Sequence, residues 1–592
     1  MKLDAKANSC DIIADQISRQ LGDRSYRENR TSEAIESYKV AISATENKWS
    51  HATKHRQEPK RVIAESLNLV VNLVKSYADE REYDKALEEA DRFRTRSLAR
   101  LLYIKNYQPK GGLPPQVLDK LDKQLSMQAR NEHLNNSPKL GIQRGPDIGQ
   151  LIHDEINLID PTFKPDFKPL EYDEIKSCIF QDERTALLYW YVAGRELIAF
   201  ILSRDAPMPA CRRYSEGKLR PLIEAFDEYI VDYRSDRVAW VQKLPLALQK
   251  LSNLLEMDSL ASQIAKCAPA ADQLILVPHR FLHLLPLHCL PLADPTTTLQ
   301  DQFARGVRFA PSLQVLNVVQ QRQQTPLQRL FAVQNPTQDL VYSDLEVYAI
   351  QPMFTEHTAI LKQDKATRSA FDHIRPSIAA SSCLHFACHG FFNFEKPQLS
   401  ALILAGSSIQ PAPPEADPNR YLLQRDGSAL DLSQCLTLLD LFQLDLRQAR
   451  LVALSACETG LSEINSPSDE FVALSSGFLY AGCNSVIGTL WIVDDLSTGL
   501  LMAEFYRLLK QQEQTQPFTD VALALKQAQQ WLRQLTCAEA VATLQRLVPS
   551  LDADGQETAK RSIRRSLSEG YAADDRPYHH PFYWAAFCAV GQ

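Results

Sequence analysis

The sequence predicts an α/β fold with a mostly parallel central sheet flanked by helices, preceded by an all-helical amino-terminal region. Two observations support this prediction. From about residue 169 onward, apolar runs of strand length alternate with helical segments, and near-continuous apolar strands are typical of a parallel sheet covered on both faces. Before that point, apolar residues recur with helical periodicity in units that are similar to one another. We therefore expect two regions of different structural class in one chain.

Composition and charge place the chain among ordinary globular proteins. Of its 592 residues, 45% are hydrophobic and 23% charged, and the formal net charge is -7, so the basic excess typical of nucleic-acid-binding proteins is missing. No apolar run is long enough to cross a bilayer, and the polar amino terminus lacks the apolar core of a secretory signal. The twelve cysteines show no disulfide framework. We expect a cytoplasmic protein with reduced thiols and without a nucleic-acid or membrane partner.

The amino-terminal region, residues 1–107, resembles an array of tetratricopeptide repeats. Two segments share a pattern of polar start, alanine, aliphatic residue and glutamate, and each has a helix upstream. Their separation exceeds the roughly 34-residue period of such repeats, so we expect an insertion at Glu46–Arg61. The two segments are Thr31–Ile42 and Tyr83–Phe93, and the upstream helices are Ile12–Gln20 and Glu65–Asp79. The alternative is a pair of generic helical hairpins.

The next segments lead into the α/β region. The helix Arg92–Tyr107 is basic on one side and aliphatic on the other, as expected for a solvated face opposite a core stripe. Residues 108–168 are rich in Pro, Gly, Asn and charge, which predicts a linker with one amphipathic helix. Two apolar runs on either side of Gly194 then predict a hairpin of Thr185–Val192 and Glu196–Ser203.

Strands and helices alternate over the rest of the chain, which predicts the parallel part of the sheet. The expected strands are Gln273–Val277, Arg329–Val333, Cys383–Ala387, Arg450–Leu454 and Ser485–Leu490. The expected helices are Lys218–Leu255, Ala366–Ile374, Glu470–Ala481, Ser497–Gln511 and Thr519–Leu535.

Two motifs carry the reactive side chains. LHFACHG (Leu384–Gly390) and LVALSACETG (Leu451–Gly460) are apolar strands that end at His389 and Cys457, respectively. Because the carboxyl ends of parallel strands meet at one edge of a sheet, we expect the imidazole and the thiol to lie together there. A thiolate is the nucleophilic form of cysteine, and a nearby imidazole or a helix amino terminus favours it. We assign Cys457 as nucleophile and His389 as acid and base.

Two other interpretations of these motifs stay open. A cysteine at the end of a buried strand is often inert packing. The spacing C-x-H-x-x-C-H also suggests zinc, but Cys388 points to the face opposite Cys383, His385 and His389, and a strand cannot arrange such ligands tetrahedrally. We therefore expect no metal, and expect His385 and Cys388 to be core or supporting residues.

The carboxyl-terminal part of the chain resembles the CHAT family of caspase-like peptidases, which are joined to tetratricopeptide repeats. The two motifs above occur in order with four further segments that are similar to the family's pattern. These are LILVPHRFLHLLPLHCL (Leu274–Leu290), VQNPTQDL (Val333–Leu340), DEFVALSSGFLYAGCNSVIGTLWIVDD (Asp469–Asp495) and HPFYWAAFCAVG (His580–Gly591). The resemblance implies a caspase-like domain at 169–592, with a non-catalytic subdomain at 169–325 and the catalytic part at 326–592.

The resemblance also implies roles for individual residues. The backbone amides of Gly390 and Cys457 would form the oxyanion hole, and a glycine at 390 lets the backbone approach the substrate carbonyl closely. The separase-type pattern places an acid near the end of LWIVDD to bind an arginine next to the cut. That implies Asp495 first and Asp494 second; Glu458, Asp469 and Glu470 are other acids nearby. The alternative for Asp494 and Asp495 is capping of the helix Ser497–Gln511.

These observations predict a cysteine endopeptidase that performs limited, regulated proteolysis, with a basic residue before the cut. The helical repeats would bind a protein regulator. A non-proteolytic scaffold built from the same two regions is the alternative. We find no glycine-rich phosphate loop after any strand and expect no cofactor. Two long segments, Ser407–Leu432 and Cys537–His579, serve either substrate binding or surface decoration.

Overall fold

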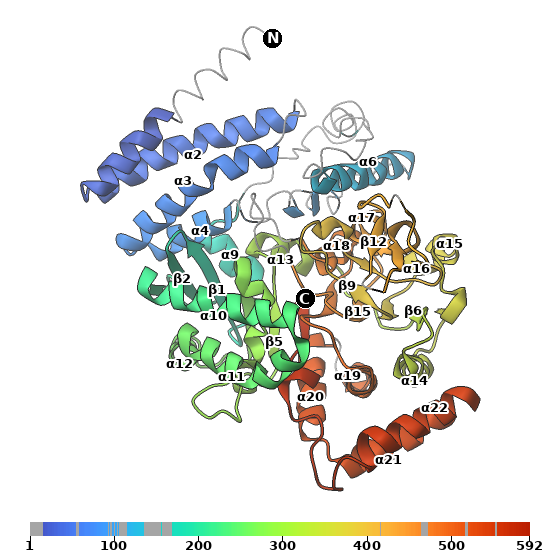
Figure 1. Ribbon diagram of the computed structural model, residues 1–592. Helices are drawn as coiled ribbons and strands as arrows, with labels where there is room; N and C mark the ends of the chain where they lie inside the picture. Colours follow the sequence, from blue (N-terminus) through green and yellow to red (C-terminus); the bar gives the residue numbers. More distant parts are fainter. Residues whose placement is uncertain are drawn as a thin grey trace.

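A central eleven-stranded sheet with helices on both faces organises the molecule (Figure 1). The computed structural model describes residues 16–54, 59–92, 94, 98–99, 101–102, 105, 115–134, 156, 169–414, 416–424, 426–462, 472–515, 519–550 and 553–592. Within these ranges, no helix combines the length and the apolar character that crossing a membrane requires.

The sheet is mostly parallel. Its strand order is β3-β2-β1-β4-β5-β17-β16-β15-β8-β6-β7, and neighbours are parallel except at β3–β2, β2–β1 and β17–β16. The strands are β1 (Thr185–Ala193), β2 (Glu196–Ser203), β3 (Ala210–Tyr214), β4 (Gln273–Val277), β5 (Gly306–Phe309), β6 (Leu330–Gln334), β7 (Thr358–Lys362), β8 (Cys383–Ala387), β15 (Leu451–Ser455), β16 (Ser485–Thr489) and β17 (Phe587–Gly591). The predicted fold class, a mostly parallel sheet flanked by helices after a helical amino-terminal region, is confirmed.

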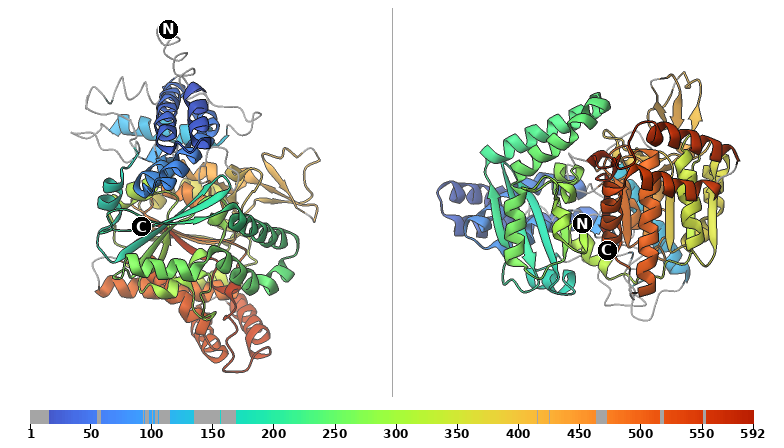
Figure 2. Two further views of the ribbon diagram at one scale, coloured as in Figure 1. Left: turned by 90° about the vertical axis from the view of Figure 1, so that its left-hand side faces the viewer. Right: turned by 90° about the horizontal axis from the view of Figure 1, so that it is seen from below.

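The sheet consists of two halves that meet at a narrow seam. The first half contains β1 to β5, and the second contains β6, β7, β8, β15, β16 and the returning β17. Between β5 and β17, a single ladder pair, Phe309 and Val590, joins the halves, whereas the strands inside each half pair over several residues. Seen from below in Figure 2, the teal-to-green first half and the yellow-to-red second half lie side by side.

The first half is covered on both faces by helices that share its apolar core. On one face, α10 and α12 contact β2, and on the other, α3 contacts β1. The helices of this part are α9 (Tyr172–Ile179), α10 (Glu216–Ser235), α11 (Arg237–Leu255), α12 (Met257–Cys267) and α13 (Leu313–Gln320).

The second half carries its own helices. α14 packs on β6 and β8, α18 packs on β16, and α20 lies against β17 and β5. The helices of this part are α14 (Val341–Ile350), α15 (Arg368–His373), α16 (Arg375–Ala379), α17 (Leu438–Leu441), α18 (Leu474–Ala481), α19 (Asp495–Thr515), α20 (Val521–Gln534), α21 (Cys537–Leu547) and α22 (Ala553–Ile563).

The amino-terminal region is helical, as predicted, but the expected insertion is not a loop. α2 (Thr31–Lys54) and α3 (Pro59–Asp79) take most of Glu46–Arg61 into two long helices, with α4 (Tyr83–Arg92) after them. These helices do not form a separate tethered body, since residues such as Leu73, Val74 and Leu87 belong to the same buried cluster as Tyr189 of β1. The assignment to tetratricopeptide repeats stays a prediction.

The following segments are described only in part. The linker helix expected within 108–168 is α6 (Pro115–Leu134). Most of the helix expected at Arg92–Tyr107 lies outside the described residues, as does the first helix expected at Ile12–Gln20 up to residue 15.

The two long segments of the α/β region are both structured. Ser407–Leu432 contains a three-stranded sheet of β11 (Ser408–Ile409), β13 (Ala429–Asp431) and β12 (Tyr421–Leu423). Cys537–His579 contains the helices α21 and α22, which project at the bottom of Figure 1. A second small sheet connects β9 (Gly390–Phe391), β10 (Ala401–Leu402) and β14 (Leu436–Thr437). It links the residue after His389 to the base of the first insertion.

Candidate active site

His389 and Cys457 follow two adjacent parallel strands at the same level. β8 and β15 pair with Ala387 opposite Ser455, so His389 and Cys457 each lie two residues beyond a matched pair. The backbones touch at this point, because a Cβ atom built on Gly390 would lie 2.8 Å from the carbonyl oxygen of Cys457. Only glycine allows this approach. The structure therefore brings the two predicted residues to one edge of the sheet.

His389 has a carboxylate partner that the sequence analysis did not identify. Its Nε2 lies 2.9 Å from Oδ2 and 3.0 Å from Oδ1 of Asp339, in the loop after β6. Partial burial acts to raise the pKa of Asp339, but hydrogen bonds from Thr337 and His389 outweigh it and hold this pKa below its usual value. Asp339 is thus an anion that orients the imidazole ring.

Asp339 lies in VQNPTQDL, a segment that the sequence analysis singled out without assigning chemistry to it. β6 is the neighbour of β8 on the side away from β15. A search for acids in the loop after each strand next to β8 is therefore the signal that finds Asp339.

The thiol of Cys457 is protonated in this arrangement, which corrects the expectation of a favoured thiolate. Burial raises its pKa to about 11, and the negative charges of Glu458 and Asp495 act in the same direction. A hydrogen bond from the backbone N–H of Val493 opposes this shift without overcoming it. Within the described part of the chain, the hydrogen-bond partner of His389 Nε2 is Asp339, not the thiol. Burial outweighs the imidazole here.

Glu458 is committed to contacts other than a substrate pocket. It is buried with a positive φ of 60°, and its Oε1 accepts a 2.6 Å hydrogen bond from the Tyr233 hydroxyl. Its Oε2 accepts from the N–H of Phe392 at 3.3 Å, and Arg237 lies 3.6 Å from Oε1. Glu458 therefore connects α10 and α11 to the motif that carries the cysteine. The acids at 469 and 470 lie outside the described residues.

Asp494 and Asp495 both bind helix starts and both line a pocket. Oδ1 of Asp494 accepts from the N–H of Ser497, in the first turn of α19, at 2.9 Å. Oδ2 of Asp495 accepts from the N–H of Tyr342, at the start of α14, at 2.9 Å. The capping contacts and the pocket are thus properties of the same two carboxylates.

The pocket that contains these acids has a volume of about 450 Å³. Asp339 lines it too, so the pocket lies beside the partner of His389. Burial raises the pKa of Asp495 to about 7, helped by the charges of Glu346 and Asp494. The remaining wall includes Tyr342, Tyr571, Tyr578 and Tyr583. The segment around the second insertion therefore contributes to this pocket.

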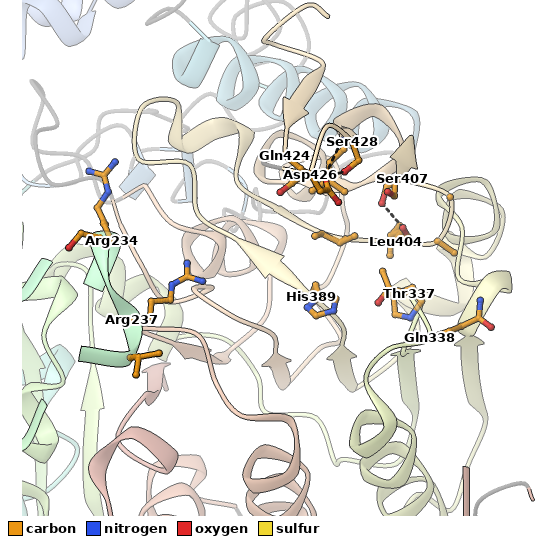
Figure 3. A pocket seen from close by; sticks show the side chains of 18 of the residues that line it. Arg234, Arg237, Thr337, Gln338, His389, Leu404, Ser407, Gln424, Asp426 and Ser428 are labelled. Atoms are coloured by element: carbon orange, nitrogen blue, oxygen red, sulfur yellow. Dashed lines mark hydrogen bonds between the residues drawn. The ribbon is translucent and has the colours of Figure 1, made fainter. Parts of the chain in front are cut away.

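On its other side, His389 lines a wide cleft of about 1170 Å³. In Figure 3, the imidazole lies between Arg234 and Arg237 at one side and residues of the first insertion, such as Asp426, at the other. The loop after β6 lines the cleft with Thr337 and Gln338. A cleft of this size, open beside the imidazole, accommodates an extended chain.

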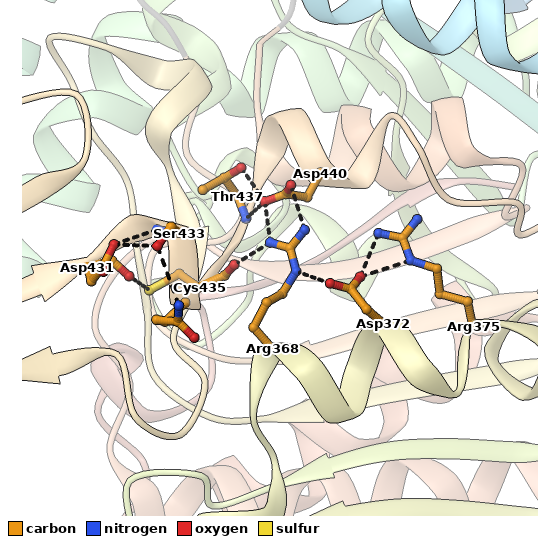
Figure 4. Close-up of polar contacts among 9 residues, drawn as sticks. Arg368, Asp372, Arg375, Asp431, Ser433, Cys435, Thr437 and Asp440 are labelled. Carbon is orange, nitrogen blue, oxygen red and sulfur yellow. Dashed lines mark hydrogen bonds and ion pairs between the residues drawn. The ribbon is translucent and has the colours of Figure 1, made fainter.

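The first insertion is anchored to the sheet region by an arginine. Arg368, at the start of α15, donates to the carbonyl oxygen of Cys435 at 2.8 Å and to Oδ1 of Asp440 at 2.9 Å (Figure 4). Its Nε donates to Asp372 at 2.9 Å. Asp431, at the end of β13, accepts from the N–H of Ser433 at 3.0 Å. These contacts fix the base of the cleft wall.

A buried polar network lies beneath the two motifs. The Nε2 atom of His385 and Oε1 of Glu346 are 2.9 Å apart, in ion-pair contact without good hydrogen-bond alignment. Ser455 Oγ donates to Oε2 of Glu346 at 2.9 Å, and the Tyr506 hydroxyl is 3.2 Å from Nδ1 of His385. His385 and Cys388 are both buried, as expected for core or supporting positions.

Comparison with known proteins relates this geometry to one family. Residues 246–592 match the CHAT domain family. A curated protein, tetratricopeptide repeat protein 28 of Mus musculus, is 29% identical over 154 residues, which are 23% of this chain and 6% of that protein. The chain therefore spans only a small fraction of this relative.

Two solved structures are also similar. One is the separase-securin complex of Saccharomyces cerevisiae, with 9% identity and a TM-score of 0.45, covering 99% of this chain and 40% of that chain. The other is the Arg specific cysteine proteinase gingipain R, with 7% identity and a TM-score of 0.30, covering 58% of this chain and 67% of that chain.

Proposed function

This chain belongs to the CHAT domain family, and from that premise and the site geometry we propose that it is a cysteine endopeptidase. The single observation that carries the proposal is the matched position of His389 and Cys457 beyond paired residues of β8 and β15. A nucleophile and its base need this proximity. The cleft beside His389 gives a polypeptide substrate access to the pair.

The proposed reaction uses these groups in order. His389 takes the thiol proton of Cys457 as the sulfur attacks the scissile carbonyl, and the amides of Gly390 and Cys457 stabilise the oxyanion. The imidazolium then protonates the leaving amine, so the C–N bond breaks and a thioester remains on the enzyme. Water, deprotonated by the same imidazole, hydrolyses the thioester and restores the thiol. Asp339 keeps the ring oriented throughout.

The described arrangement is that of a resting enzyme. A thiol with a pKa of about 11 is almost entirely protonated at neutral pH. We propose that a partner or a substrate shifts His389 toward the sulfur and so raises the population of the reactive form. If the purified chain alone cleaves a true substrate at its full rate, this activation step does not exist.

We propose that the 450 Å³ pocket accepts a basic side chain next to the cut. Asp494 and Asp495 supply negative charge, and the tyrosines supply ring faces that attract a guanidinium. A cation that enters the pocket would favour the ionised form of Asp495. Peptides with arginine before the cut should therefore react faster than matched peptides with alanine, and Asp495→Asn should reduce this preference by about tenfold.

The decisive experiment labels the thiol with a peptidyl electrophile that ends in arginine, followed by mass mapping of the modified residue. We expect modification of Cys457, none in Cys457→Ala, and a rate at least about a hundredfold lower in His389→Ala. Cys211→Ser, at another partly exposed cysteine, is the matched control and should be labelled like the parent chain. Label on other cysteines, at a rate independent of His389, would contradict the assignment.

A scaffold without proteolytic activity is the second candidate, because the thiol is protonated and hydrogen-bonded to the N–H of Val493 rather than to His389. Under that function, α2 to α4 would bind a protein partner and the α/β region would transmit nothing chemical. Co-purification with Cys457→Ala discriminates between the two. A substrate is retained by the variant and lost from the active chain, whereas a scaffold partner is retained equally by both.

For either function, we propose that a protein regulator binds the amino-terminal helices. These helices share a buried cluster with β1 and α13, and Asp91 at the end of α4 accepts from the N–H of Leu313 at the start of α13 at 3.1 Å. A displacement of these helices would therefore reach the sheet directly. Removal of Asp91 contacts, by Asp91→Ala, should weaken regulation without changing the cysteine site.

A further inference from the structure

A second cavity lies at the edge of the sheet opposite the cysteine and histidine. Its volume is about 720 Å³. Its lining includes the first residues of three strands, Thr185 of β1, Gln273 of β4 and Ser485 of β16. His389 and Cys457 follow the carboxyl ends of strands, whereas this cavity opens at the amino ends. It is therefore separate from the proposed catalytic site.

The lining of this cavity is strongly basic. It contains five arginines and two aspartates, so positive charge exceeds negative charge. The arginines are Arg184, Arg305, Arg308, Arg322 and Arg450, and the aspartates are Asp182 and Asp520. Arg184 pairs with Asp272, and Arg305 lies 3.1 Å from Asp520. The positive charges that these acids do not balance belong to the other three arginines.

Two of those arginines keep donors without a hydrogen-bond acceptor. Nε of Arg308 and both Nε and Nη2 of Arg322 are buried and make no hydrogen bond within the described structure. Nη1 of Arg322 donates to the carbonyl oxygen of Cys483 at 2.6 Å, and the amide oxygen of Gln320 accepts from Nη2 of Arg308 at 3.0 Å. Buried donors are normally satisfied, so these guanidinium groups lack an acceptor of matching geometry.

The remaining arginine differs from these two. Nε of Arg450 donates to Thr519 Oγ1 at 2.9 Å, and its other nitrogens donate to Gln324 and to the Thr519 carbonyl. Its hydrogen bonds are complete, but no carboxylate pairs with it in the described part of the chain. It adds charge to the cavity without an orphan donor.

The cavity also spans the seam between the two halves of the sheet. Arg308 is part of β5 in the first half, and Arg450 directly precedes β15 in the second. β5 is joined to β17 by a single ladder pair. Like charges on both sides of so narrow a junction repel each other, and an anion between them would replace repulsion by attraction.

We propose that this cavity binds a small, multiply charged phosphate compound, held by Arg308 and Arg322 and bridging the two halves of the sheet. Phosphate oxygens match the planar fork of a guanidinium, which donates two parallel hydrogen bonds. The cavity volume falls in the range of small-molecule sites, roughly 300–1000 Å³. Burial lowers the pKa of both arginines to about 10, so both carry a full charge at neutral pH.

Calorimetric titration of the full chain with sodium tripolyphosphate tests the proposal. We expect saturable binding that weakens with added salt, and an affinity lowered roughly tenfold or more by each of Arg308→Gln and Arg322→Gln. Arg220→Gln is the matched control, because this arginine is exposed on α10 and outside the cavity. It should bind tripolyphosphate like the parent chain.

Three further arms make the result unambiguous. Adenosine triphosphate should bind at least as tightly as tripolyphosphate, and tighter binding would add a base contact to the same site. Citrate should bind more weakly, and equal binding of citrate would overturn the phosphate class. The double substitution of both arginines by lysine keeps the charge and guards against misfolding; it should bind more tightly than the double glutamine variant. Absence of tripolyphosphate binding, or binding indifferent to both arginines, would overturn the proposal.

Discussion

The two halves of the sheet each place a histidine two residues beyond a buried parallel strand, with different results. His279 follows β4 in the first half, and His389 follows β8 in the second. The strand next to β4 brings Tyr191 to the level of His279, since Tyr189 pairs with Val277. The strand next to β8 brings Cys457 to the level of His389. The histidines occupy equivalent positions, and their neighbours differ.

The surroundings of the two rings follow from that difference. His279 is 2% exposed, stacks on Tyr191 with ring centroids 4.8 Å apart, and its Nδ1 accepts the N–H of Val192 at 2.8 Å. The side chain of His389 is 34% exposed, pairs with Asp339 and faces a cleft. One histidine completes the packing of a strand end and the other is available for chemistry. A histidine at a strand end is therefore a catalytic signal only when the adjacent strand supplies a nucleophile.

The largest expected effect separates the two histidines by activity. His389→Ala should lower kcat/KM by about 10²–10⁴-fold, the usual contribution of a general acid and base. His279→Ala should leave kcat/KM per folded molecule unchanged, because its ring contacts no proposed substrate cleft. Peptide hydrolysis by the activated chain measures both. A comparable loss in the two variants would end the distinction.

The same pair should show the opposite order in stability. His279→Ala leaves the N–H of Val192 buried without an acceptor and should lower the free energy of unfolding by about 1–3 kcal/mol. His389→Ala removes an exposed ion pair and should change it by less than about 1 kcal/mol. Urea denaturation followed by tryptophan fluorescence measures the difference. A larger loss in the His389 variant would show that this ring is structural.

A pair of buried carboxylates extends the comparison. Asp91 in the first half and Asp495 in the second both bind helix starts, and burial raises their pKa values to about 6 and about 7. Because the folded-state pKa of Asp495 exceeds its unfolded value of 3.8, its contribution is complete below that value and is lost as the pH rises toward 7. Asp495→Asn should flatten this fall by about 2 kcal/mol. Denaturation across pH 4 to 8 tests this, and an unchanged slope would contradict the raised pKa.

The smallest effect concerns the orienting carboxylate. Asp339→Asn should lower kcat by about tenfold and leave KM unchanged, since an exposed carboxylate orients the imidazole without binding substrate. Asp339→Glu should restore part of the rate. Because its pKa is below the usual value, the difference between Asp339 and Asn should persist throughout the neutral and mildly acidic range. A rise in KM alone would instead place Asp339 in substrate binding.

Most of the sheet could be predicted because its strands are fully buried. β1, β2, β4, β8, β15 and β16 consist of uninterrupted apolar residues and coincide with the predicted runs to within one or two residues. β5 was missed because Gly306–Phe309 is short and contains Arg308. The strands of the first insertion were missed since two- and three-residue strands leave no periodicity to detect.

The site was predictable as far as strand ends define it. His389, Gly390 and Cys457 were identified because each follows a buried strand within a motif. Asp339 was not, because a lone aspartate in a loop is a common turn residue, and its role arises only from the packing of β6 beside β8. The commitment of Glu458 to Tyr233 and Arg237 likewise requires a helix more than two hundred positions away in the chain.

The amino-acid order alone determined which segments form strands, which residues stand at their carboxyl ends, and that a cysteine and a histidine share one edge. These properties depend on local apolar patterns and on the alternation of strands and helices. Tertiary structure alone decided the protonation of the thiol, the partner of the imidazole, and the gathering of arginines at the seam. Those properties depend on burial and on distances between remote segments, and the free energy of a charge is set by the groups that surround it after folding.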